Sequence, residues 1–443
     1  MTDTRAEPTD EVNPHYLNHV VSTAQAHDVA VSEDILTGNG IKLLAKGARI
    51  DAGTRERLLR HKLAKPLEDC LEIVDGLIPA RFGPVAAQLL ERHPLLQALC
   101  APERSRSIPE SLAKLSLSTP MQSLLTVYAQ QQEARVEHAV GVAALAMALA
   151  RKLMPGEIER HRTLATAGLV HDIGELYIEP ELVQKSTRLD ALQWRHIAAH
   201  PLIAYRVLRD MVGAGGAVAN AVLMHHERLD GFGYPSGLGG DEFTLDGQIL
   251  AAAEWLMGMV ESGVTPLLRA SMAARLVPGE FCPALLDAVS SAARSVPDMP
   301  IELATAPPLE EVVPRILRIA ATLGRFLEAQ AWIEEQIAAA APPARLVLES
   351  GLRRIQRIRA SFSSTGFDAE SPERIVAELA ALRDARIYSE IVTLVDEMEW
   401  RMRELEREQQ LRAAQLSLDG QRLVYSIVGR LKGGQGVPEG LTA

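Results

Sequence analysis

The sequence has few of the residues that stabilise small secreted domains or bind nucleic acid. Only three of its 443 residues are cysteines (Cys70, Cys100 and Cys282), and their spacing contains no CxxC pair. This excludes a disulfide framework and a cysteine-rich zinc finger, and it favours a reducing compartment, so we expect a cytoplasmic protein. Acidic residues outnumber basic ones by 57 to 46, for a formal net charge of −11. That charge argues against a general binder of nucleic acid or anionic membranes.

Aromatic residues and long apolar runs are also scarce. Aromatic residues make up 4% of the chain, although 47% is hydrophobic. This balance, with much alanine and leucine, favours helices packed on helices over a β-sandwich. The longest apolar run, 140–150, is too short to span a bilayer. The acidic N-terminus does not resemble a signal peptide, and the length suggests two or three domains.

The chain divides by composition into four parts. We expect a disordered tail at 1–14, a small α+β accessory module at 15–80, a helical region at 110–328, and a C-terminal helical region at 329–443. Within the module the pattern predicts strands at 27–31, 40–50 and 71–74, a turn at 37–40 that joins the first two, and a helix at 52–61 capped by Asp51.

The two helical regions differ in pattern. In the middle region a long helix is expected from Met121 to Leu153, with His138 on its apolar face. In the C-terminal region, Ala-Ala-Ala-Ala-Pro-Pro at 338–343 marks a break. A charged helix beyond it carries an apolar seam. The seam fits dimerisation or partner docking, and it fits equally well an amphipathic helix packed on the same chain. Its residues are Ile391, Leu394, Met398, Met402 and Leu405, and the i, i+4 pairs beside it are Glu397/Arg401, Glu399/Arg403 and Glu408/Arg412.

The densest run of polar and turn-forming residues lies at 225–235, with the sequence His-His-Glu-Arg-Leu-Asp-Gly-Phe-Gly-Tyr-Pro. Two adjacent histidines end an apolar helix predicted at 218–224, and a loop with two glycines follows. A single histidine of this kind is usually a core or surface residue with an ordinary hydrogen bond. Core packing does not explain the whole run, so it is the first candidate for a functional site.

Seven polar residues of the middle region fall at predicted helix ends or on an apolar helix face. Imidazole and carboxylate groups are ligands of divalent ions such as iron, manganese, zinc and nickel. Five histidines and two carboxylates exceed the needs of one ion and suit two, because His171 can hold one ion while Asp172 reaches between both. On this evidence alone, His138 is equally well explained as a buried histidine with a backbone partner. The candidates are His138, His171, Asp172, His200, His225, His226 and Glu254.

Three motifs resemble the HD-GYP family, a branch of the HD-domain phosphohydrolases. They are His171-Asp172-Ile173-Gly174, His200-Pro201 and the run at 225–235. The resemblance covers about residues 120 to 295, and the run at 225–235 is its most specific part. It implies an all-helical metal enzyme that hydrolyses cyclic di-GMP to linear pGpG or GMP. The N-terminal segment also resembles the small module that precedes this domain in some relatives.

The resemblance implies a role for each matching position. The seven candidates would be metal ligands, with Asp172 as the bridge between two ions. Iron or manganese would be the first choice, and nickel, zinc or magnesium the alternatives. Asp172 and Arg228 would be the catalytic residues. Glycines permit the loop's turns, and Pro235 favours an extended Tyr234 that can face a guanine or a ribose. The substrate side would be formed by Arg228, Asp230, Gly231, Gly233, Tyr234 and Pro235.

Five positions depart from the family pattern. Glu175 stands where a lysine is usual, and its charge should repel an anionic substrate unless it turns away or becomes a ligand. A Glu175→Lys change should therefore lower KM if repulsion limits the enzyme. Glu254 is one methylene longer than the usual aspartate. Ala134 replaces a ligand for a third ion, so two ions are expected. Ala204 replaces a glycine, and 262–266 lacks an Arg-Pro-Tyr-Arg-like stretch.

The sequence therefore predicts a mainly α fold: an all-helical HD-type bundle with a small N-terminal α+β module and a C-terminal helical extension. The predicted function is a metal-dependent phosphodiesterase that converts cyclic di-GMP to pGpG or GMP through a metal-bridging hydroxide. Two alternatives stay open. One is a catalytically impaired module that senses cyclic di-GMP or serves as a scaffold, and the other is a phosphohydrolase of another nucleotide. The expected partner is a cyclic dinucleotide, without nucleic acid or membrane. A homodimer or a signalling partner would use the C-terminal helices.

Overall fold

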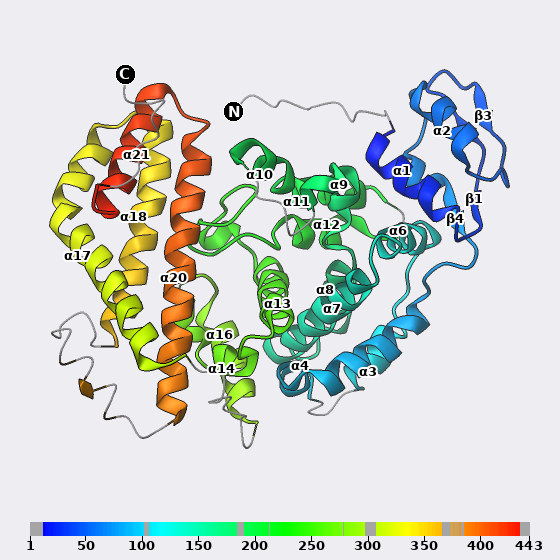
Figure 1. The fold of residues 1–443 in the computed structure, drawn as a ribbon. Helices are drawn as coiled ribbons and strands as arrows, with labels where there is room; N and C mark the ends of the chain where they lie inside the picture. Colours follow the sequence, from blue (N-terminus) through cyan, green and yellow to red (C-terminus); the bar gives the residue numbers. More distant parts are fainter. Residues whose placement is uncertain are drawn as a thin grey trace.

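The structure is a computed structural model. It describes residues 12–434 except 102–105, 184–189, 212, 278, 297–306 and most positions of 366–384. Of the tail expected at 1–14, residues 1–11 lie outside the described residues, whereas Pro14 begins a helix, so disorder up to residue 14 was wrong. Residues 435–443 also lie outside the described residues. Figure 1 shows a small N-terminal module, a helical middle region and a set of long C-terminal helices. The predicted mainly α class is confirmed. Among the residues described, no helix combines the length and apolarity needed to cross a membrane.

The N-terminal module contains two helices and two small antiparallel sheets. The Asp51 side chain accepts a hydrogen bond from Thr54 N at 2.8 Å and so begins the second helix as predicted. The turn at 37–40 joins β2 (Ile35–Leu36) to β3 (Lys42–Leu44), and the buried Ile35 pairs with Leu44 across it. The expectation that this turn joins the first predicted strand to the second was therefore wrong, because β2 lies between them. β1 pairs with β4. The elements are α1 Pro14–Thr23, β1 Val29–Val31, β2 Ile35–Leu36, β3 Lys42–Leu44, α2 Ala52–Leu59, η1 Leu67–Cys70 and β4 Leu71–Ile73.

The middle region is a bundle of short and medium helices around one central helix, α7. Its elements are η2 Pro79–Arg81, α3 Phe82–Arg92, α4 Pro94–Leu99, α5 Ile108–Leu112, α6 Thr119–Ala129, α7 Glu133–Leu153, α8 Ile158–Val170, η3 Ile173–Tyr177, α9 Pro180–Val183, α10 Ala191–Ile197, α11 His200–Arg209, α12 Gly215–Leu223, η4 Gly240–Glu242, α13 Leu245–Ser262, α14 Pro266–Ser271, α15 Ala273–Leu276 and α16 Pro283–Arg294.

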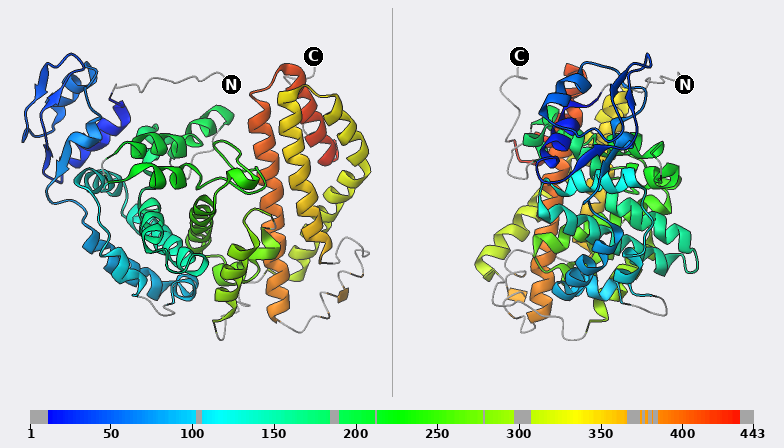
Figure 2. Two further views of the ribbon diagram at one scale, coloured as in Figure 1. Left: turned by 180° about the vertical axis from the view of Figure 1, so that it is seen from behind. Right: turned by 90° about the vertical axis from the view of Figure 1, so that its right-hand side faces the viewer.

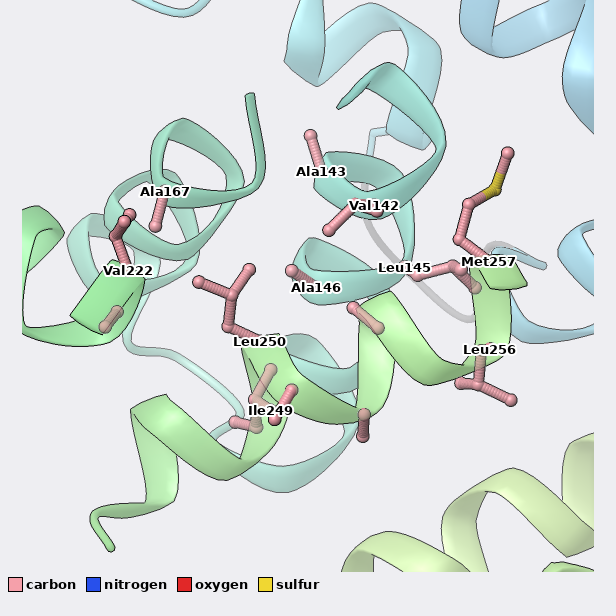
Figure 3. Close-up of a cluster of buried hydrophobic side chains, with 14 of the residues drawn as sticks. Val142, Ala143, Leu145, Ala146, Ala167, Val222, Ile249, Leu250, Leu256 and Met257 are labelled. Atoms are coloured by element: carbon pink, nitrogen blue, oxygen red, sulfur yellow. The ribbon is translucent and has the colours of Figure 1, made fainter. Parts of the chain in front are cut away.

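Helix α7 is buried on all sides over 139–150, which explains why its sequence is apolar without a polar face. Figure 3 shows its packing against α8 and α13. A Cβ at Gly168 of α8 would lie 2.6 Å from Cα of Ala143, so only glycine permits this approach. A Cβ at Gly141 would lie 2.5 Å from Sδ of Met257 on α13. The three helices therefore pack closely one turn away from His138 and His171.

The single long helix expected from Met121 to Leu153 is two helices, α6 and α7, with a break at 130–132. The two halves pack on different partners. α6 contacts β4 and η1 of the N-terminal module, whereas α7 contacts α8 and α13. Neither glycine nor proline marks this break, so local sequence does not reveal it.

In the C-terminal part, the described residues form the helices α17 Leu309–Ala339, α18 Pro342–Ser363, α20 Ala385–Ala413 and α21 Leu418–Leu431. The break expected at 338–343 is confirmed, because α17 ends at Ala339 and α18 begins at Pro342. The boundary expected between 328 and 329 instead falls inside α17. One buried face of this helix runs from Val312 to Ile337.

Helix α20 joins the C-terminal helices to the middle region. It contacts α10, α14 and α15 on one side and α17, α18 and α21 on the other, and Figure 2 shows it in this position from behind. Leu394, Met398 and Leu405 of the predicted apolar seam are 1–8% exposed. Of the two interpretations left open, packing on the same chain is confirmed, and dimerisation stays a prediction.

Candidate metal centre and substrate loop

Three of the predicted ligands stand within three residues after the end of a helix and are held there by the backbone. His171 follows α8, His200 follows α10 by three residues and begins α11, and His225 follows α12 by two residues. The Nδ1 atom of each donates to a carbonyl three residues earlier, in a last helical turn where few intrahelical donors remain. The acceptors are Gly168 O at 2.8 Å, Ile197 O at 2.8 Å and Val222 O at 2.6 Å. Because a carbonyl only accepts, each Nδ1 carries a proton, and in the neutral imidazole Nε2 is left with a lone pair.

His138, on α7, is held in a similar way by an acid. Its Nδ1 lies 2.7 Å from Oε1 of Glu261 on α13. Sequence reasoning missed Glu261, although it stands seven residues after Glu254 and therefore on the same face of α13. The expectation of a backbone partner for a buried His138 does not apply, since the partner is a carboxylate.

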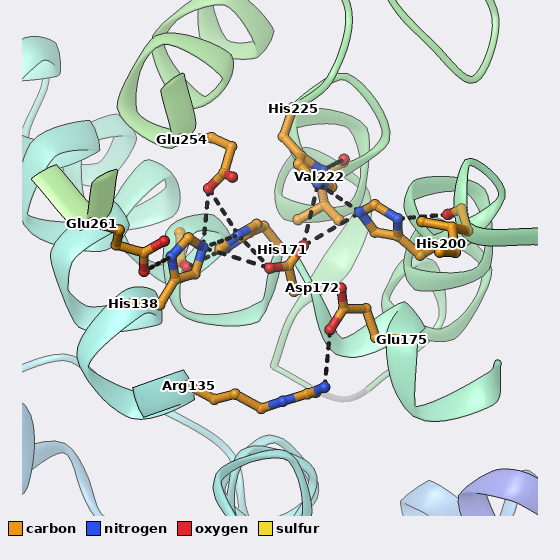
Figure 4. Close-up of polar contacts among 12 residues, drawn as sticks. Arg135, His138, His171, Asp172, Glu175, His200, Val222, His225, Glu254 and Glu261 are labelled. Carbon is orange, nitrogen blue, oxygen red and sulfur yellow. Dashed lines mark hydrogen bonds and ion pairs between the residues drawn. The ribbon is translucent and has the colours of Figure 1, made fainter. Parts of the chain in front are cut away.

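The structure brings all seven candidate ligands together from five separate segments, as Figure 4 shows for six of them. Their ligand atoms form two groups, and within each group the atoms lie within 4.8 Å of one another. One group is His138, His171 and Glu254, and the other is Asp172, His200, His225 and His226. We call these seven residues the ligand cluster.

Asp172 lies between the two groups. Its Oδ2 is 3.0 Å from Nε2 of His171 and 3.5 Å from Nε2 of His138. Its Oδ1 is 3.3 Å from Nε2 of His200 and 3.5 Å from Nε2 of His225. Each oxygen thus faces a different group, an arrangement that suits a carboxylate shared by two cations.

The Nε2 atoms of two histidine pairs face each other closely enough to need a proton or a cation between them. The Nε2 atoms of His138 and His171 are 3.2 Å apart, and those of His200 and His225 are 3.0 Å apart. With the protons on Nδ1, these Nε2 pairs present lone pair to lone pair. Oε2 of Glu254 is buried without a hydrogen-bond partner among the described residues, although it lies 3.1 Å from Nε2 of His138. The donor set therefore fits a divalent ion in each group.

The electrostatics of the cluster show a demand for positive charge, which protons meet when no ion is bound. Burial lowers the pKa of His171, but the carboxylates of Asp172 and Glu254 outweigh burial and raise it to about 10. Burial raises the pKa of both carboxyl groups, yet the neighbouring histidines lower each well below its usual range. Burial and the charges of His200 and His171 lower the pKa of His225 to about 4, so this imidazole is neutral at pH 7, as a metal ligand must be. Metal ions bound to the cluster would take the place of the protons on its other histidines.

Gly174 brings the His-Asp motif against the neighbouring histidine. A Cβ at Gly174 would lie 2.1 Å from the carbonyl oxygen of His200, so no other residue permits η3 to approach α11 this closely. Ala204, on the next turn of α11, is fully buried in the same contact.

The loop at 227–239, which we call the substrate loop, is organised by a residue that sequence reasoning did not assign. Glu227 is fully buried, and its carboxylate accepts from the backbone nitrogens of Ser236, Gly237 and Leu238 at 2.7, 3.1 and 2.9 Å. A Cβ at Gly233 would lie 2.3 Å from Cα of Glu227, so the loop closes only with glycine there. Its position directly after His225-His226, inside the most polar run of the sequence, was the signal that could have identified Glu227.

Tyr234 of this loop lies beside the second ligand group. Its ring stacks on His226 with centroids 4.5 Å apart and an angle of 23° between the planes. Trp194 of α10 meets the same tyrosine edge-on at 5.6 Å. The peptide bond from Tyr234 to Pro235 is cis. Sequence reasoning did not single out Trp194, which extends the aromatic surface next to the ligands.

The other predicted substrate contacts are engaged elsewhere. Asp230 is 3% exposed and lies 3.2 Å from Nη1 of Arg354 and 3.0 Å from Nη1 of Arg357, both on α18. Arg228 lies 3.6 Å from Glu280 and over the ring of Phe281. The physical reason is long-range: α18 and α20 bring arginines against the loop, and a buried carboxylate pairs with them.

These contacts belong to a second buried polar group, which we call the arginine cluster. Glu280 contacts Arg401, and its Oε1 lies 3.1 Å from Nη2 of Arg354. The predicted i, i+4 pair Glu397/Arg401 is present at 2.9 Å and is buried. From α20, Arg412 donates to Gly233 O at 3.2 Å. The members are Arg228, Asp230, Glu280, Arg354, Glu397 and Arg401.

Glu175 lies in neither ligand group. Its Oε2 is 3.3 Å from Nη2 of Arg135 on α7, as Figure 4 shows. Burial and the negative charge of Asp172 raise the pKa of Glu175 to about 7. Arg135 also lies over the ring of Tyr128, at 4.8 Å from its centroid. The acid that departs from the family pattern is therefore paired with a cation.

Comparison with known proteins places this geometry in a family. Residues 121–274, which contain all seven ligands and the substrate loop, match the HD domain family. The 3'3'-cGAMP-specific phosphodiesterase 3 of Vibrio cholerae is 28% identical over 250 residues, or 53% of this chain and 54% of that protein. A cyclic di-GMP phosphodiesterase of Pseudomonas aeruginosa is 38% identical over 109 residues, or 24% and 26%. The chain thus spans about half the length of the first relative and about a quarter of the second.

Residues 121–274 match an HD domain, a family whose members depend on metal. The similarity extends to relatives that are named as phosphodiesterases of cyclic dinucleotides. The matched domain and these relatives support the resemblance to the HD-GYP family. A solved HD-GYP protein from Bdellovibrio bacteriovorus aligns with a TM-score of 0.34 and 14% identity over 61% of this chain and 96% of that chain.

Proposed function

We propose that this protein is a metal-dependent phosphodiesterase that hydrolyses a cyclic dinucleotide, with cyclic di-GMP as the first candidate. The observation that carries the proposal is Asp172, whose two oxygens face two separate groups of ligand atoms. Relatives named for cyclic di-GMP and for 3'3'-cGAMP support the substrate class. Both molecules are rings closed by phosphodiesters, so both belong in the first assay.

The proposal assigns one divalent ion to each ligand group, with iron or manganese first and nickel, zinc or magnesium as alternatives. His138, His171 and Glu254 would hold one, and His200, His225 and His226 the other, with Asp172 shared. When bound, such ions lower the pKa of water and neutralise charge on phosphoryl oxygens.

The chain's own residues orient the ligands and shape the substrate side. The hydrogen bonds from Nδ1 to backbone carbonyls fix the rings of His171, His200 and His225, so that Nε2 of each points at the cluster. Tyr234 and Trp194 offer an aromatic surface to a base of the substrate. Arg228 and Asp230, implied as substrate contacts, instead position the loop through their pairs with Glu280 and with the arginines of α18.

The decisive experiment measures metal and product on one sample. The full chain is purified without air, loaded with iron or manganese, and given cyclic di-GMP and 3'3'-cGAMP. We expect about two ions per chain and a linear product, pGpG or GMP from cyclic di-GMP. An Asp172→Asn variant should lose both metal and turnover. Bound metal with intact cyclic dinucleotides would contradict the proposal.

One observation favours a second candidate, a module that binds cyclic di-GMP without hydrolysing it. Glu175 places a carboxylate near Asp172, where an anionic substrate would meet it. Saturable binding of cyclic di-GMP without product, in protein shown to hold metal, would establish this sensor. Hydrolysis of other phosphate esters alone would indicate a phosphohydrolase of another nucleotide.

A further inference from the structure

The C-terminal helices line a partly open cavity of about 220 Å³. All four helices, α17, α18, α20 and α21, contribute to its wall. The wall is mostly apolar, with Phe326, Ile333, Leu352, Ile355, Leu405 and Val424 among its residues. Figure 1 shows these helices side by side, with α20 next to the middle region.

The four helices leave more space between them than close packing gives. Protein interiors hold few cavities larger than a water molecule, because each missing contact costs stability. An engineered apolar cavity of about 150 Å³ stays dry and binds benzene. The cavity between these helices is larger, so a small organic molecule fits where no side chain does.

One polar atom of the wall is without a partner. Gln409 is 5% exposed, and its Nε2 is buried with no hydrogen bond to any residue that the structure describes. Its amide lies against Gly351 of α18, where a Cβ would come within 2.7 Å of Cδ of Gln409. The amide is thus held at the cavity wall, and a buried donor of this kind needs an acceptor.

The two cations of the wall, Arg403 and Lys432, are largely exposed to solvent. Nζ of Lys432 also lies 2.5 Å from Oε1 of Glu406. A charged ligand would enter an apolar space without an opposite charge to meet it. The wall therefore suits an uncharged molecule with one hydrogen-bond acceptor.

The same two helices also hold the substrate loop. On α18, Leu352 and Ile355 line the cavity, while Arg354 pairs with Asp230 of the loop. On α20, Gln409 lines the cavity, while Arg412 donates to Gly233 O. A ligand that changes the distance between α18 and α20 must therefore also move the arginines that contact the loop.

We propose that this cavity binds a compact, uncharged, mostly apolar molecule with a hydrogen-bond acceptor, and that its occupancy alters the substrate loop. The second part rests on the proposed function, whereas the first does not. Three probe molecules test separately the need for an apolar shape, for an acceptor and for the absence of charge. Acetophenone has the acceptor, ethylbenzene has the same shape without it, and benzoate adds a charge.

Binding is measured by calorimetric titration of the full chain. We expect one acetophenone per chain, affinity for ethylbenzene about 3- to 10-fold weaker, and no binding of benzoate. Gln409→Leu should remove the preference for acetophenone. Leu352→Trp and Val428→Trp, on different helices, should each fill the cavity and remove binding of both neutral probes. The site is overturned if acetophenone shows no saturable binding. It is also overturned if the two tryptophan variants are folded and bind acetophenone as tightly as the wild type does.

The link to the loop is measured separately, as turnover of cyclic di-GMP with and without saturating acetophenone. A change in turnover that disappears in Leu352→Trp supports the link, and unchanged turnover at full occupancy overturns it. If the chain hydrolyses no cyclic dinucleotide at all, the proposed function fails. In that case the titrations still decide the binding site, and a change in cyclic di-GMP affinity on adding acetophenone replaces turnover as the measure of the link.

Discussion

The ligand cluster and the arginine cluster are both buried and polar, but only the arginine cluster is complete, in the sense that each of its carboxylates faces an arginine of the chain. Glu280 faces Arg401 and Arg354, Asp230 faces Arg354, and Glu397 faces Arg401. Among the buried side-chain atoms of these pairs, only the Nε atoms of Arg354 and Arg401 are left without a hydrogen bond to the described residues. In the ligand cluster the partners of the carboxylates are histidines, which carry positive charge only when they take up a proton. Burial of charge alone therefore does not identify a functional site, whereas the absence of a permanently charged partner does.

The largest effect should follow from breaking the complete cluster. Glu280→Gln leaves Arg401, Arg354 and Arg228 buried without their shared carboxylate. We expect a loss of about 3–5 kcal/mol of unfolding free energy, because an uncompensated buried charge is costly. Denaturant titration measures this. The control is Glu56→Gln in the exposed pair with Arg60, which should change stability by less than about 1 kcal/mol. Equal effects would contradict the distinction between the two kinds of pair.

The comparison of wild type with Glu280→Gln also predicts how the stability difference depends on pH. Burial raises the pKa of Glu280, but Arg401, Arg354 and Arg228 outweigh it and lower the value to about 2. A folded pKa below the unfolded value of about 4.3 gives stability that is present above pH 4.3 and lost as the pH falls through 2. The difference in stability between wild type and Glu280→Gln should therefore be smaller at pH 3 than at pH 7. A difference that grows on acidification would contradict this assignment.

Breaking the incomplete cluster should affect metal and turnover instead of stability. His171→Gln removes one Nε2 from its group, and we expect turnover and metal affinity to fall by about 100-fold or more, at least the loss seen when a second-shell partner is removed. His161 is a matched control, since it lies on the neighbouring helix α8, is 7% exposed and binds the carbonyl of Met154 at 2.8 Å. His161→Gln should lower stability and leave the metal content unchanged. Loss of metal in both variants would show that the effect is structural.

A smaller effect is expected at the loop between the two clusters. Gly233→Ala places a Cβ within 2.3 Å of the backbone of Glu227, so the loop must shift together with Tyr234. We expect turnover to fall by about 10-fold and stability by about 1–3 kcal/mol. In Gly258→Ala, a helical position on α13 with open space around it, stability should instead rise by up to about 1 kcal/mol.

The two clusters were not equally visible in the sequence. The ligand cluster could be predicted because its members occupy short motifs, such as His171-Asp172 and His225-His226, in which spacing determines where each side chain lies. The arginine cluster could not, because most of its contacts join residues far apart in the chain, such as Asp230 and Arg354, which are 124 positions apart. Local patterns carry no information about which arginine of a charged helix turns inward.

The same reason explains the individual errors. Glu397 and Arg401 were expected as an ordinary i, i+4 pair, and the pair exists, but its burial depends on the packing of α20 against Glu280. Asp230 was assigned to the substrate because it stands in the motif run, while its carboxylate faces α18. The position of a residue in a motif predicted the course of the backbone. It did not predict which partner, distant in the sequence, the side chain contacts.

The smallest expected effect tests whether Glu175 limits the enzyme. Because Glu175 pairs with Arg135 at 3.3 Å, its repulsion of an anionic substrate is partly cancelled. Glu175→Gln removes the acid and leaves Arg135 to attract the substrate, so KM should fall by about 2- to 5-fold with kcat unchanged, as expected for one partly exposed charge. Arg135→Met should raise KM by a similar factor. If kcat changes in either variant and KM does not, the pair of Glu175 and Arg135 acts on the ligand cluster and not on the substrate. That result would contradict its assignment to the substrate side.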